Sequence, residues 1–532
     1  MSKVMNVTDA VKHIKDGMTL GVCGTGPALE PDLVLQALED YFQETGSPRN
    51  LTLFCSHTPS DRLKEGGYNC FCHKGMVTRV IGSSFNKHRH PKLLEMFKNE
   101  ELEGYTVGMG TLTRLLGAIA TGQPGLLTTV GLGTFMDPRV EGGCMNKRST
   151  NPPVKLVQFE DKEYLFYPSM PIDVAIIRGT TADENGYISF EEEPNRISAL
   201  DLAAATRASG GFVIAQVKYI ARARTLDPQK VRIPGPLVDA VVVHPTQTQV
   251  TPGMANPLEG WNPYLVGALK MPLNDVPPIK EVISRTILRR SILELRNGDV
   301  INLGVGIPTG LPVIALEEGI LDHLIFTNEH GVFGGLMASA FGKSFVTAFN
   351  PDALMGAGFQ FGFYEGGGLN IALLGIGELD AEGNINVSKF ATEWTGPGGF
   401  NSITDTTPNL VFCGSLTTGG LEVAVDNGKL RIVKEGQFRK FVPKVEQITL
   451  NAKRAHAKGQ RVLYVTERAV FQLTSDGLEL IEIAPGIDLE RDIQANIGFS
   501  LRISQNLKLM DARIFTSSLL GVIHGFADNK TR

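Results

Sequence analysis

Two segments in different halves of the chain follow the same order of turn, strand, turn and helix. The first is DGMTLGVCGTGPALEPDLVLQALED, from Asp16, and the second is NGDVINLGVGIPTGLPVIALEEG, from Asn297. In each, an apolar run follows a polar residue and glycine, and a turn with glycine and proline leads into a helical pattern. Internal similarity of this kind indicates a duplicated fold, so we expect the same architecture in both halves of the chain.

A second pair of segments repeats with matching spacing. DVAIIRGTTADENGYISF begins at Asp173 and NIALLGIGELDAEGNINV begins at Asn370. In both, an aspartate (Asp183, Asp380) lies ten residues after the first position, and a glycine follows three residues later. Strands that alternate with helical patterns predict a mostly parallel sheet covered by helices. We therefore predict an α/β protein with two tandem, internally similar open α/β domains.

The halves meet in a proline-bearing stretch, KMPLNDVPPIK, Lys270 to Lys280. A chain of 532 residues is long enough for two domains, and we place them at residues 1–275 and 276–532. Near the end, VTERAVFQLTSDGLELIEIAPGIDL (465–489) has the pattern of strand, Ser-Asp-Gly turn and strand. This pattern predicts a C-terminal β-hairpin extension.

Composition excludes several classes of function. The net charge of -5 gives no basic footprint, so we expect no nucleic-acid partner. The N-terminal residues do not have the pattern of a signal peptide, and no apolar run is long enough to span a bilayer, so we expect no membrane partner. Six cysteines are few for this length and indicate reduced thiols in a cytoplasmic protein.

One cluster of potential metal ligands lies in the N-terminal half. It consists of Cys70, Cys72 and His73, with His88 and His90 further along the chain. The C-x-C-H spacing does not match the strong zinc patterns. We predict that the protein uses no metal.

Glu329 is the most conspicuous polar residue of the second half. It lies in FTNEHGVFGG (326–335), after the apolar run HLIFT (323–327) and before a glycine turn, beyond which the pattern becomes helical. The run predicts a short buried strand, and open α/β sheets bind ligands at the carboxyl ends of their strands. The residues leave three interpretations open: a turn or cap residue, an acid that binds a ribose, and a nucleophile.

Two glycine-rich loops allow more than one reading. GVGIPTG (304–310) is close to a dinucleotide fingerprint, with Glu329 as the distal acid, but its last glycine is one residue late and Pro308 lies within the turn. TGPGGFNS (395–402) leaves backbone N–H groups uncovered by side chains. Such a loop binds a phosphate or an oxyanion, or is simply a tight turn.

Together these segments resemble the class I coenzyme A transferases, in particular the single-chain short-chain acyl-CoA:acetate, propionate or acetoacetate type. The resemblance covers almost the whole chain. It rests on TVGLGTFMDPRVEGG (129–143), VRIPGPLVDAVVV (231–243), GVGIPTG, NEHGVFGG (328–335), FYEGGGLNIALLG (363–375), GPGGF (396–400) and VTERAVF (465–471). It implies an enzyme that moves CoA from a short-chain acyl-CoA to a free acid such as acetate, propionate, butyrate or acetoacetate. It also implies that the enzyme needs no cofactor, because the CoA thioester is itself a substrate.

The resemblance assigns roles to particular residues. Glu329, in an E-x-G turn with Gly331, is the implied nucleophile, which forms a covalent glutamyl-CoA thioester in a ping-pong reaction. Backbone donors to the oxyanion are implied at Gly396, Gly398 and Gly399. Asn384 and Asn386 match positions near the CoA thioester, and loop capping is an equal alternative for both. The implied acyl-pocket candidates are Gly24, Thr25, Gly26, Gly108, Met109 and Gly110.

The sequence departs from the family at three places near the implied acid pocket: YTVGMGTL (105–112), GSSFNKH (82–88) and His330. Substrate choice is therefore open, and we expect a broad profile over short acyl groups. The run Lys218, Arg222 and Arg224 either approaches CoA phosphates or forms a solvated face.

The alternative functions are an acyl-CoA hydrolase with the same glutamate, a dinucleotide-binding oxidoreductase and a non-catalytic relative. By general frequency we expect a homodimer or homotetramer.

Overall fold

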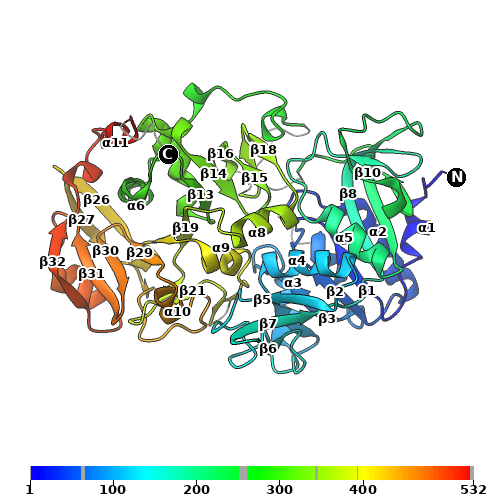
Figure 1. The fold of residues 1–532 in the computed structure, drawn as a ribbon, viewed down its shortest axis with the longest axis horizontal. Coiled ribbons are helices and arrows are strands. Elements are labelled where there is room, and N and C mark those ends of the chain that lie inside the picture. Colours follow the sequence, from blue (N-terminus) through cyan, green and yellow to red (C-terminus); the bar gives the residue numbers. More distant parts are fainter. Residues whose placement is uncertain (1, 61–65, 251–260, 342–344, 392, 528–532) are drawn as a thin grey trace.

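The computed structural model describes residues 2–60, 66–250, 261–341, 345–391 and 393–527. Two large sheets lie side by side, one built from residues 19–243 and the other from residues 300–509. In Figure 1, helices α4 (Met109–Ala120), α8 (Ala357–Glu365) and α9 (Phe400–Thr406) lie between the sheets, and these three helices contact one another. The predicted domain boundary at residues 275/276 falls between the last strand of the first sheet and the first strand of the second.

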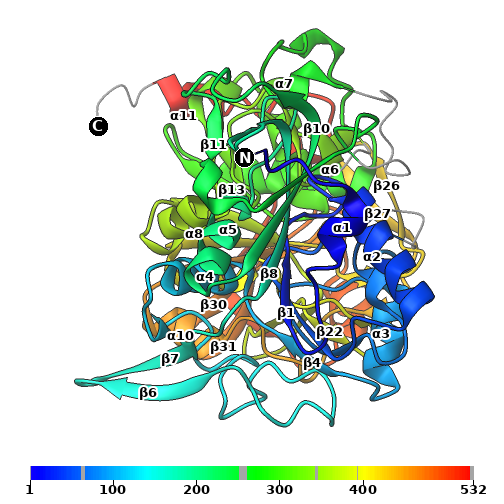
Figure 2. The ribbon, with the colours of Figure 1, turned by 90° about the vertical axis from the view of Figure 1, so that its right-hand side faces the viewer.

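The N-terminal half contains the first sheet, a small three-stranded sheet and five helices among the described residues. The first sheet is formed by β1 (Thr19–Val22), β2 (Leu51–Cys55), β3 (Val77–Gly82), β4 (Glu103–Thr106), β8 (Val174–Asp183), β9 (Ile188–Ser189), β10 (Phe212–Ala221), β11 (Val231–Ile233) and β12 (Ala240–Val243). The helices are α1 (Val7–Val11), α2 (Asp32–Thr45), α3 (Pro91–Lys98), α4 and α5 (Ala199–Ala208). The small sheet consists of β5 (Gly125–Thr128), β6 (Lys155–Phe159) and β7 (Lys162–Pro168). Figure 2 shows β6 and β7 as a ribbon that projects from the body.

The C-terminal half contains the second sheet, several two-stranded ribbons and six helices in the described ranges. The sheet is formed by β13 (Val300–Leu303), β14 (Ile325–Asn328), β15 (Val332–Phe333), β18 (Ala353–Leu354), β19 (Ile371–Gly375), β24 (Asn409–Cys413), β29 (Arg461–Val465), β30 (Ala469–Thr474), β31 (Gly477–Ile483) and β32 (Arg502–Leu509). The ribbons pair β16 (Leu336–Met337) with β17 (Ala348–Phe349), β20 (Glu378–Leu379) with β21 (Ile385–Asn386), β22 (Lys389–Phe390) with β23 (Glu393–Trp394), β25 (Thr417–Thr418) with β28 (Phe438–Arg439), and β26 (Glu422–Asp426) with β27 (Lys429–Lys434). The helices are α6 (Val282–Ser291), α7 (Leu311–Glu317), α8, α9, α10 (Ala452–Ala457) and α11 (Ile523–Ala527).

The two sheets share the same central topology. In the first sheet the order is β12-β10-β8-β1-β2, and in the second it is β29-β24-β19-β13-β14. Every neighbouring pair in both series is parallel. This confirms the predicted α/β class and the duplication of the fold.

The repeated aspartates form the same turn in each half. Oδ1 of Asp183 accepts hydrogen bonds of 3.0 Å from the backbone N–H groups two and four residues later. Oδ1 of Asp380 accepts from the equivalent N–H groups at 3.1 and 3.0 Å. The glycine of each turn has a positive φ, 83° at Gly186 and 90° at Gly383, a conformation that glycine adopts without strain. The matching spacing in the sequence is therefore the signature of one turn used twice.

The halves differ at the edges of the sheets. Beyond β2 the first sheet continues with the parallel strands β3 and β4, whereas beyond β14 the second continues with the antiparallel strands β15 and β18. The predicted C-terminal hairpin is confirmed as β30 and β31, and it extends the second sheet. The chain forms the short strands β15 and β16 directly after Glu329, and the helical pattern expected beyond the glycine turn begins as a 3-10 helix at Ala338–Phe341. Gly331, Gly334 and Gly335 have φ values of 86°, 75° and 81°, and such left-handed residues interrupt a helix.

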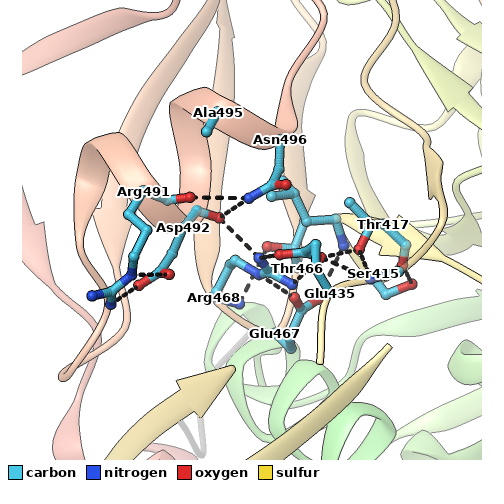
Figure 3. A network of polar contacts seen from close by, with 12 residues as sticks. Ser415, Thr417, Glu435, Thr466, Glu467, Arg468, Arg491, Asp492, Ala495 and Asn496 are labelled. Carbon is cyan, nitrogen blue, oxygen red and sulfur yellow. Dashed lines mark hydrogen bonds and ion pairs between the residues drawn. The ribbon is translucent and has the colours of Figure 1, made fainter. Parts of the chain in front are cut away.

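A buried network around Arg468 joins three segments of the C-terminal half (Figure 3). Arg468, which is 0% exposed, donates from Nε to Glu467 at 2.5 Å and from Nη1 to Glu435 at 2.7 Å. Nη1 also donates to the backbone oxygen of Asp492 at 2.8 Å. The VTERAVF motif is therefore a structural anchor between β29, β30 and the segments packed on them.

No helix among the described residues is long and apolar enough to cross a membrane. The six cysteines are all free thiols, as the sequence predicted.

Candidate active site

A cavity of about 380 Å³ lies between the two halves of the chain. The N-terminal half contributes residues that follow β1, β2 and β3 and the first residue of α4. The C-terminal half contributes residues at the ends of β13 and β19 and residues that follow β14. Glu329 lines this cavity together with the loop that contains Gly396 and Gly398. The site is thus formed at the carboxyl ends of parallel strands from both sheets, where open α/β sheets bind ligands.

The strand end beneath Glu329 is held by buried hydrogen bonds. Thr327, on β14, donates from its hydroxyl to the backbone oxygen of Ile301 at 2.9 Å and accepts from the Tyr364 hydroxyl at 2.8 Å. Gly331, two residues after the glutamate, has a φ of +86°, and a Cβ there would lie 2.1 Å from the backbone oxygen of Met355. Only glycine fits this turn, which explains the E-x-G spacing.

Burial raises the pKa of Glu329 to about 7, and a hydrogen bond from the Gly399 N–H acts in the opposite direction. Two other carboxylates of the C-terminal half have cationic partners: Glu365 pairs with Arg114, and Glu393 pairs with Lys87. Glu329 forms no ion pair within the described ranges. It is therefore a desolvated carboxylate whose charge is offset by one backbone dipole, which leaves its oxygens available for reaction.

The glycine loop supplies fewer free donors than the sequence predicted. The N–H of Gly396 donates to the backbone oxygen of Ser388 at 3.0 Å, and that of Gly398 donates to the backbone oxygen of Ser83 at 2.9 Å. Only the N–H of Gly399 is directed at Glu329, with a distance of 2.9 Å to Oε2. Of the three N–H groups predicted to be oxyanion donors, those of Gly396 and Gly398 are already used to hold the loop in place, and that of Gly399 faces the glutamate.

Residues of the N-terminal half fix this loop from the other side. The N–H of Met109 donates to the backbone oxygen of Gly398 at 2.7 Å, in addition to the bond between Gly398 and Ser83. The loop therefore belongs to the C-terminal half by sequence but is hydrogen-bonded to the N-terminal half at the position before Gly399.

Asn302, on β13, is a candidate that the sequence analysis missed. Its side chain lines the cavity and is 1% exposed, and neither Nδ2 nor Oδ1 has a hydrogen-bond partner in the described part of the chain. A buried amide without partners is costly, and it is a donor ready for a ligand oxygen. The available signal was a polar residue inside the otherwise apolar strand VINL.

The six acyl-pocket candidates divide into two groups. Thr25, Gly26 and Met109 line the cavity, whereas Gly24, Gly108 and Gly110 do not. A Cβ at Gly24 would lie 2.7 Å from Pro59, and one at Gly110 would lie 2.3 Å from Oγ of Ser402. Gly24 and Gly110 permit close packing, and Gly108 precedes the first turn of α4.

All three departures from the family pattern contribute to the cavity wall. Ser84, Phe85 and Asn86 come from one of them, Met109 from the second, and His330 is the third. Burial, and then the nearby Arg89 charge, lower the pKa of His330 to about 3, so its imidazole is neutral at physiological pH. The ring packs edge-on against Phe345, with centroids 4.9 Å apart.

Asn384 and Asn386 have structural roles. Asn384 donates to Asp380 at 3.1 Å and accepts from the N–H of Ala452 at 2.9 Å. Asn386 donates to Glu378 at 2.8 Å and accepts from the N–H of Ser388 at 3.0 Å. Neither side chain lines the cavity, so the loop-capping alternative describes them.

The remaining polar clusters lie elsewhere. Lys218 pairs with Glu192 at 2.7 Å, and Lys218, Arg222 and Arg224 do not line the cavity. His73 contacts Glu39 at 2.7 Å, and His90 contacts the backbone oxygen of Pro59 at 3.2 Å, so the cysteine–histidine cluster does not converge. In the ranges that the structure describes, no group of three or more His, Cys, Asp or Glu residues could hold a metal ion.

Comparison with known proteins gives one family. Residues 4–244 match the coenzyme A transferase family. The chain is 42% identical to the caffeate CoA-transferase of Acetobacterium woodii, over 98% of this chain and 99% of that one. It is 39% identical to the acetate CoA-transferase YdiF of Escherichia coli K12, over 98% and 96% of the two chains.

Solved structures agree with these matches. The apoenzyme of the acyl-CoA transferase YdiF from Escherichia coli O157:H7 superposes with a TM-score of 0.91 and 39% identity, and the match covers 98% of this chain and 97% of that one. The thioester complex of the same protein with CoA gives a TM-score of 0.90 and 38% identity, with the same coverage.

Proposed function

This chain belongs to the coenzyme A transferase family, and from that membership we propose that Glu329 is the carboxylate that carries CoA between two acids. The observation that supports this role is its environment. Glu329 is buried, lines the cavity between the halves, and is contacted by the Gly399 N–H at 2.9 Å, with no cation paired to it in the part of the chain that the structure describes. A nucleophilic carboxylate needs this combination, because an ion pair would reduce its reactivity.

The proposed reaction has two half-reactions. An oxygen of Glu329 attacks the thioester carbonyl carbon, the C–S bond breaks, and a mixed anhydride and CoA thiolate form. The thiolate then attacks the glutamyl carbonyl, which releases the first acid and leaves a glutamyl-CoA thioester. A second acid reverses both steps, so the kinetics are ping-pong. The free energy of the thioester is conserved from the first acyl-CoA to the second, so the reaction needs no ATP, metal or other cofactor.

Each attack creates a tetrahedral oxyanion, which needs hydrogen-bond donors. We assign this role to the Gly399 N–H and to Nδ2 of Asn302, which is buried in the cavity wall without a partner among the described residues. Loss of one such donor typically costs about 3 kcal/mol of barrier. Both donors are fixed by strand or loop, so they need little reorganisation during the reaction.

The proposed substrates are short acids of the acetate, propionate, butyrate or acetoacetate type. Phe85, Met109 and Phe345 give the cavity apolar walls. A methylene group buried there is worth only ~0.8 kcal/mol, so discrimination by chain length is modest and the profile is broad. Because one relative is a caffeate CoA-transferase, caffeate belongs in the panel of acids to be tested.

An acyl-CoA hydrolase with the same glutamate is the alternative. Water would then resolve the anhydride or the thioester in place of a second acid. The two functions are separated by supplying acetate with propionyl-CoA. Transfer yields acetyl-CoA, whereas hydrolysis consumes propionyl-CoA without a new CoA ester.

The decisive experiment traps the covalent intermediate. Acyl-CoA without an acceptor acid should leave CoA attached to Glu329, and borohydride should reduce that thioester to an alcohol. Peptide mass analysis should place the change in the segment FTNEHG. Glu329→Gln should lower turnover by several orders of magnitude. Glu393→Gln, which breaks only the ion pair with Lys87, is the matched control and should retain turnover. An adduct on another carboxylate, or near-full transfer by Glu329→Gln, would refute the proposal.

We further propose that the enzyme acts in the cytoplasm, without metal, as a homodimer or homotetramer. Light scattering at working concentration should show a particle of at least twice the 57.6 kDa chain mass. Activity should survive a chelator. Loss of activity that zinc restores would contradict the metal-free mechanism.

A further inference from the structure

A second cavity, of about 370 Å³, lies in the N-terminal half. It is lined by residues of the turn between β8 and β9 and of the segment that leads from β10 into β11, and it shares no lining residue with the cavity at Glu329. Strands β8 and β10 are parallel neighbours (Figure 1). Val22, at the end of β1, pairs with Ile176, and β8 continues from there to Asp183, seven residues further on. At about 3.3 Å per residue, the second cavity lies roughly 20 Å beyond the end of β1.

A buried aspartate holds the two lining segments together. Oδ1 of Asp183 accepts from the backbone N–H groups of Asn185 and Tyr187 at 3.0 Å, and Oδ2 accepts from that of Arg224 at 2.8 Å. Arg224 has a φ of +67°, which is uncommon for a residue other than glycine. Asp183 therefore fixes the backbone of three lining residues, and three N–H dipoles offset its own charge.

Three polar side chains of the lining are not used by the fold. Among the described residues, Asn185, Tyr187 and Arg224 form hydrogen bonds with their backbone groups only, and the Arg224 guanidinium has no carboxylate partner. The rest of the lining beside Asp183 is apolar: Leu226, Pro228 and Val231. A few polar groups set in an apolar wall are the usual composition of a small-molecule site.

The corresponding turn of the C-terminal half is covered by protein. There the Tyr464 hydroxyl donates to the backbone oxygen of Gly383 at 2.6 Å. Asn384, which occupies the position of Tyr187 in the repeat, accepts from the N–H of Ala452 at 2.9 Å. Strand β29 and helix α10 thus pack on that turn, whereas the turn of the N-terminal half lines a cavity. The duplicated fold therefore has a ligand-sized space in one half where the other half has protein.

We propose that the second cavity binds a small organic anion, with its charge on the Arg224 guanidinium and a ring or short apolar chain against the apolar wall. Guanidinium groups bind carboxylates and phosphates through paired, charge-assisted hydrogen bonds. Tyr187, which is 38% exposed, offers an aromatic face and a hydroxyl. A carboxylate and a phosphate ester share this chemistry. The inference is independent of the reaction proposed at Glu329.

The test measures binding to the wild-type protein by isothermal titration calorimetry. The probes are phenyl phosphate, 3-phenylpropionate and the neutral analogue 3-phenylpropanol. We expect a Kd of about 1 mM or tighter for at least one anion, and binding of the alcohol that is at least about tenfold weaker. Tighter binding of phenyl phosphate identifies a phosphate ester as the ligand, and tighter binding of 3-phenylpropionate identifies a carboxylate. Absence of binding by both anions, or equal binding of the alcohol, would overturn the proposal without any variant.

Variants assign the binding to this cavity. Arg224→Met keeps a long side chain and removes the guanidinium, so the Kd of the anion should rise at least about tenfold. Arg222→Met is the matched control, because it removes an exposed positive charge two residues away that does not line the cavity. Its Kd should stay within about threefold of wild type. An unchanged Kd in Arg224→Met, or an equal loss in Arg222→Met, would refute a specific site at Arg224.

Arg224→Met should fold as the wild type does. The side chain is exposed and has no partner among the described residues, and the backbone N–H that binds Asp183 remains. The Tm and the rate of transfer from propionyl-CoA to acetate should therefore equal those of the wild type. Loss of anion binding with normal transfer shows that the second cavity is separate from the catalytic one. Parallel loss of transfer in Arg224→Met at an unchanged Tm would contradict that separation.

Discussion

The backbone N–H of Gly399 lies 2.9 Å from Oε2 of Glu329, and a Cβ built at residue 399 would lie 2.1 Å from the same oxygen. The carboxylate thus occupies the space that any other residue at 399 would fill. One glycine both supplies the donor and makes room for the group that accepts from it.

Gly399→Ala should therefore displace the carboxylate without unfolding the protein. The backbone at residue 399 has φ −84° and ψ −1°, which alanine adopts readily. A displacement of about 1 Å costs roughly 100-fold in rate, and we expect at least this loss of transfer. Gly362→Ala is the matched control, because nothing lies within 4 Å of a Cβ there. Wild-type rates in Gly399→Ala would show that the carboxylate position is not critical.

The first half-reaction should depend on pH through Glu329. The pKa of this carboxyl is raised to about 7, and only the ionised form attacks a thioester. The single-turnover rate of adduct formation should rise about tenfold per pH unit below pH 7 and level off above it. Rapid-quench measurement from pH 5 to pH 9 checks this, and a flat profile across pH 7 would contradict the assignment.

The same pKa predicts how Glu329→Gln affects stability. A carboxyl whose pKa rises from 4.5 to about 7 on folding favours the folded state below pH 4.5, and that contribution is lost as pH rises through 7. The change corresponds to roughly 3 kcal/mol. Glutamine does not titrate, so the Tm of Glu329→Gln relative to wild type should increase between pH 4 and pH 8. A difference in Tm that is constant over this range would argue against a raised pKa.

Asn302→Leu should separate activity from stability. The leucine removes a buried amide that has no partner among the described residues, so Tm should stay constant or increase. Transfer should fall by roughly 100-fold to 1000-fold, because an oxyanion donor is lost. Asn401→Leu is a useful comparison, because that amide donates to the backbone oxygen of Thr449 at 2.8 Å and its loss should lower Tm. If Asn302→Leu leaves the rate of transfer unchanged, Asn302 is not the second oxyanion donor.

Arg468→Met should destabilise the C-terminal half. It leaves Glu467, which is 0% exposed, without its cationic partner, and removal of one partner from a buried pair costs roughly 3–5 kcal/mol. Arg502→Met breaks an exposed pair with Asp476 and should change stability by at most ~1 kcal/mol. Thermal unfolding of both variants measures the difference, and equal Tm values would show that the buried network contributes nothing.

The duplicated topology could be predicted because the same hydrogen-bonded turn occurs in both halves. Asp183 and Asp380 each accept from N–H groups two and four residues later, so the turn fixes the spacing that the sequence displays. The short strands after Glu329 could not be predicted in this way. Glycines with positive φ direct the chain into these strands, and the spacing of hydrophobic residues contains no information about φ.

The site was predictable only in part, because many of its features depend on partners distant in the sequence. Gly110 looks like a pocket residue until Ser402 is seen to pack 2.3 Å from where its Cβ would be. The N–H of Gly398 looks free until the backbone oxygen of Ser83 is found opposite it. The role of Asn302 could not be predicted, because the cavity that it lines is formed by residues of both halves.

The attachment of the glycine loop to both halves links the geometry of the cleft to the nucleophile. Gly398 is tied to Ser83 and Met109 of the N-terminal half, and the next residue supplies the donor to Glu329. A rocking motion that opened the cleft would pull this donor away from the carboxylate, which would then hold its proton more tightly and lose reactivity. The half without the nucleophile therefore contributes to its reactivity, through the donor whose loop that half helps to hold.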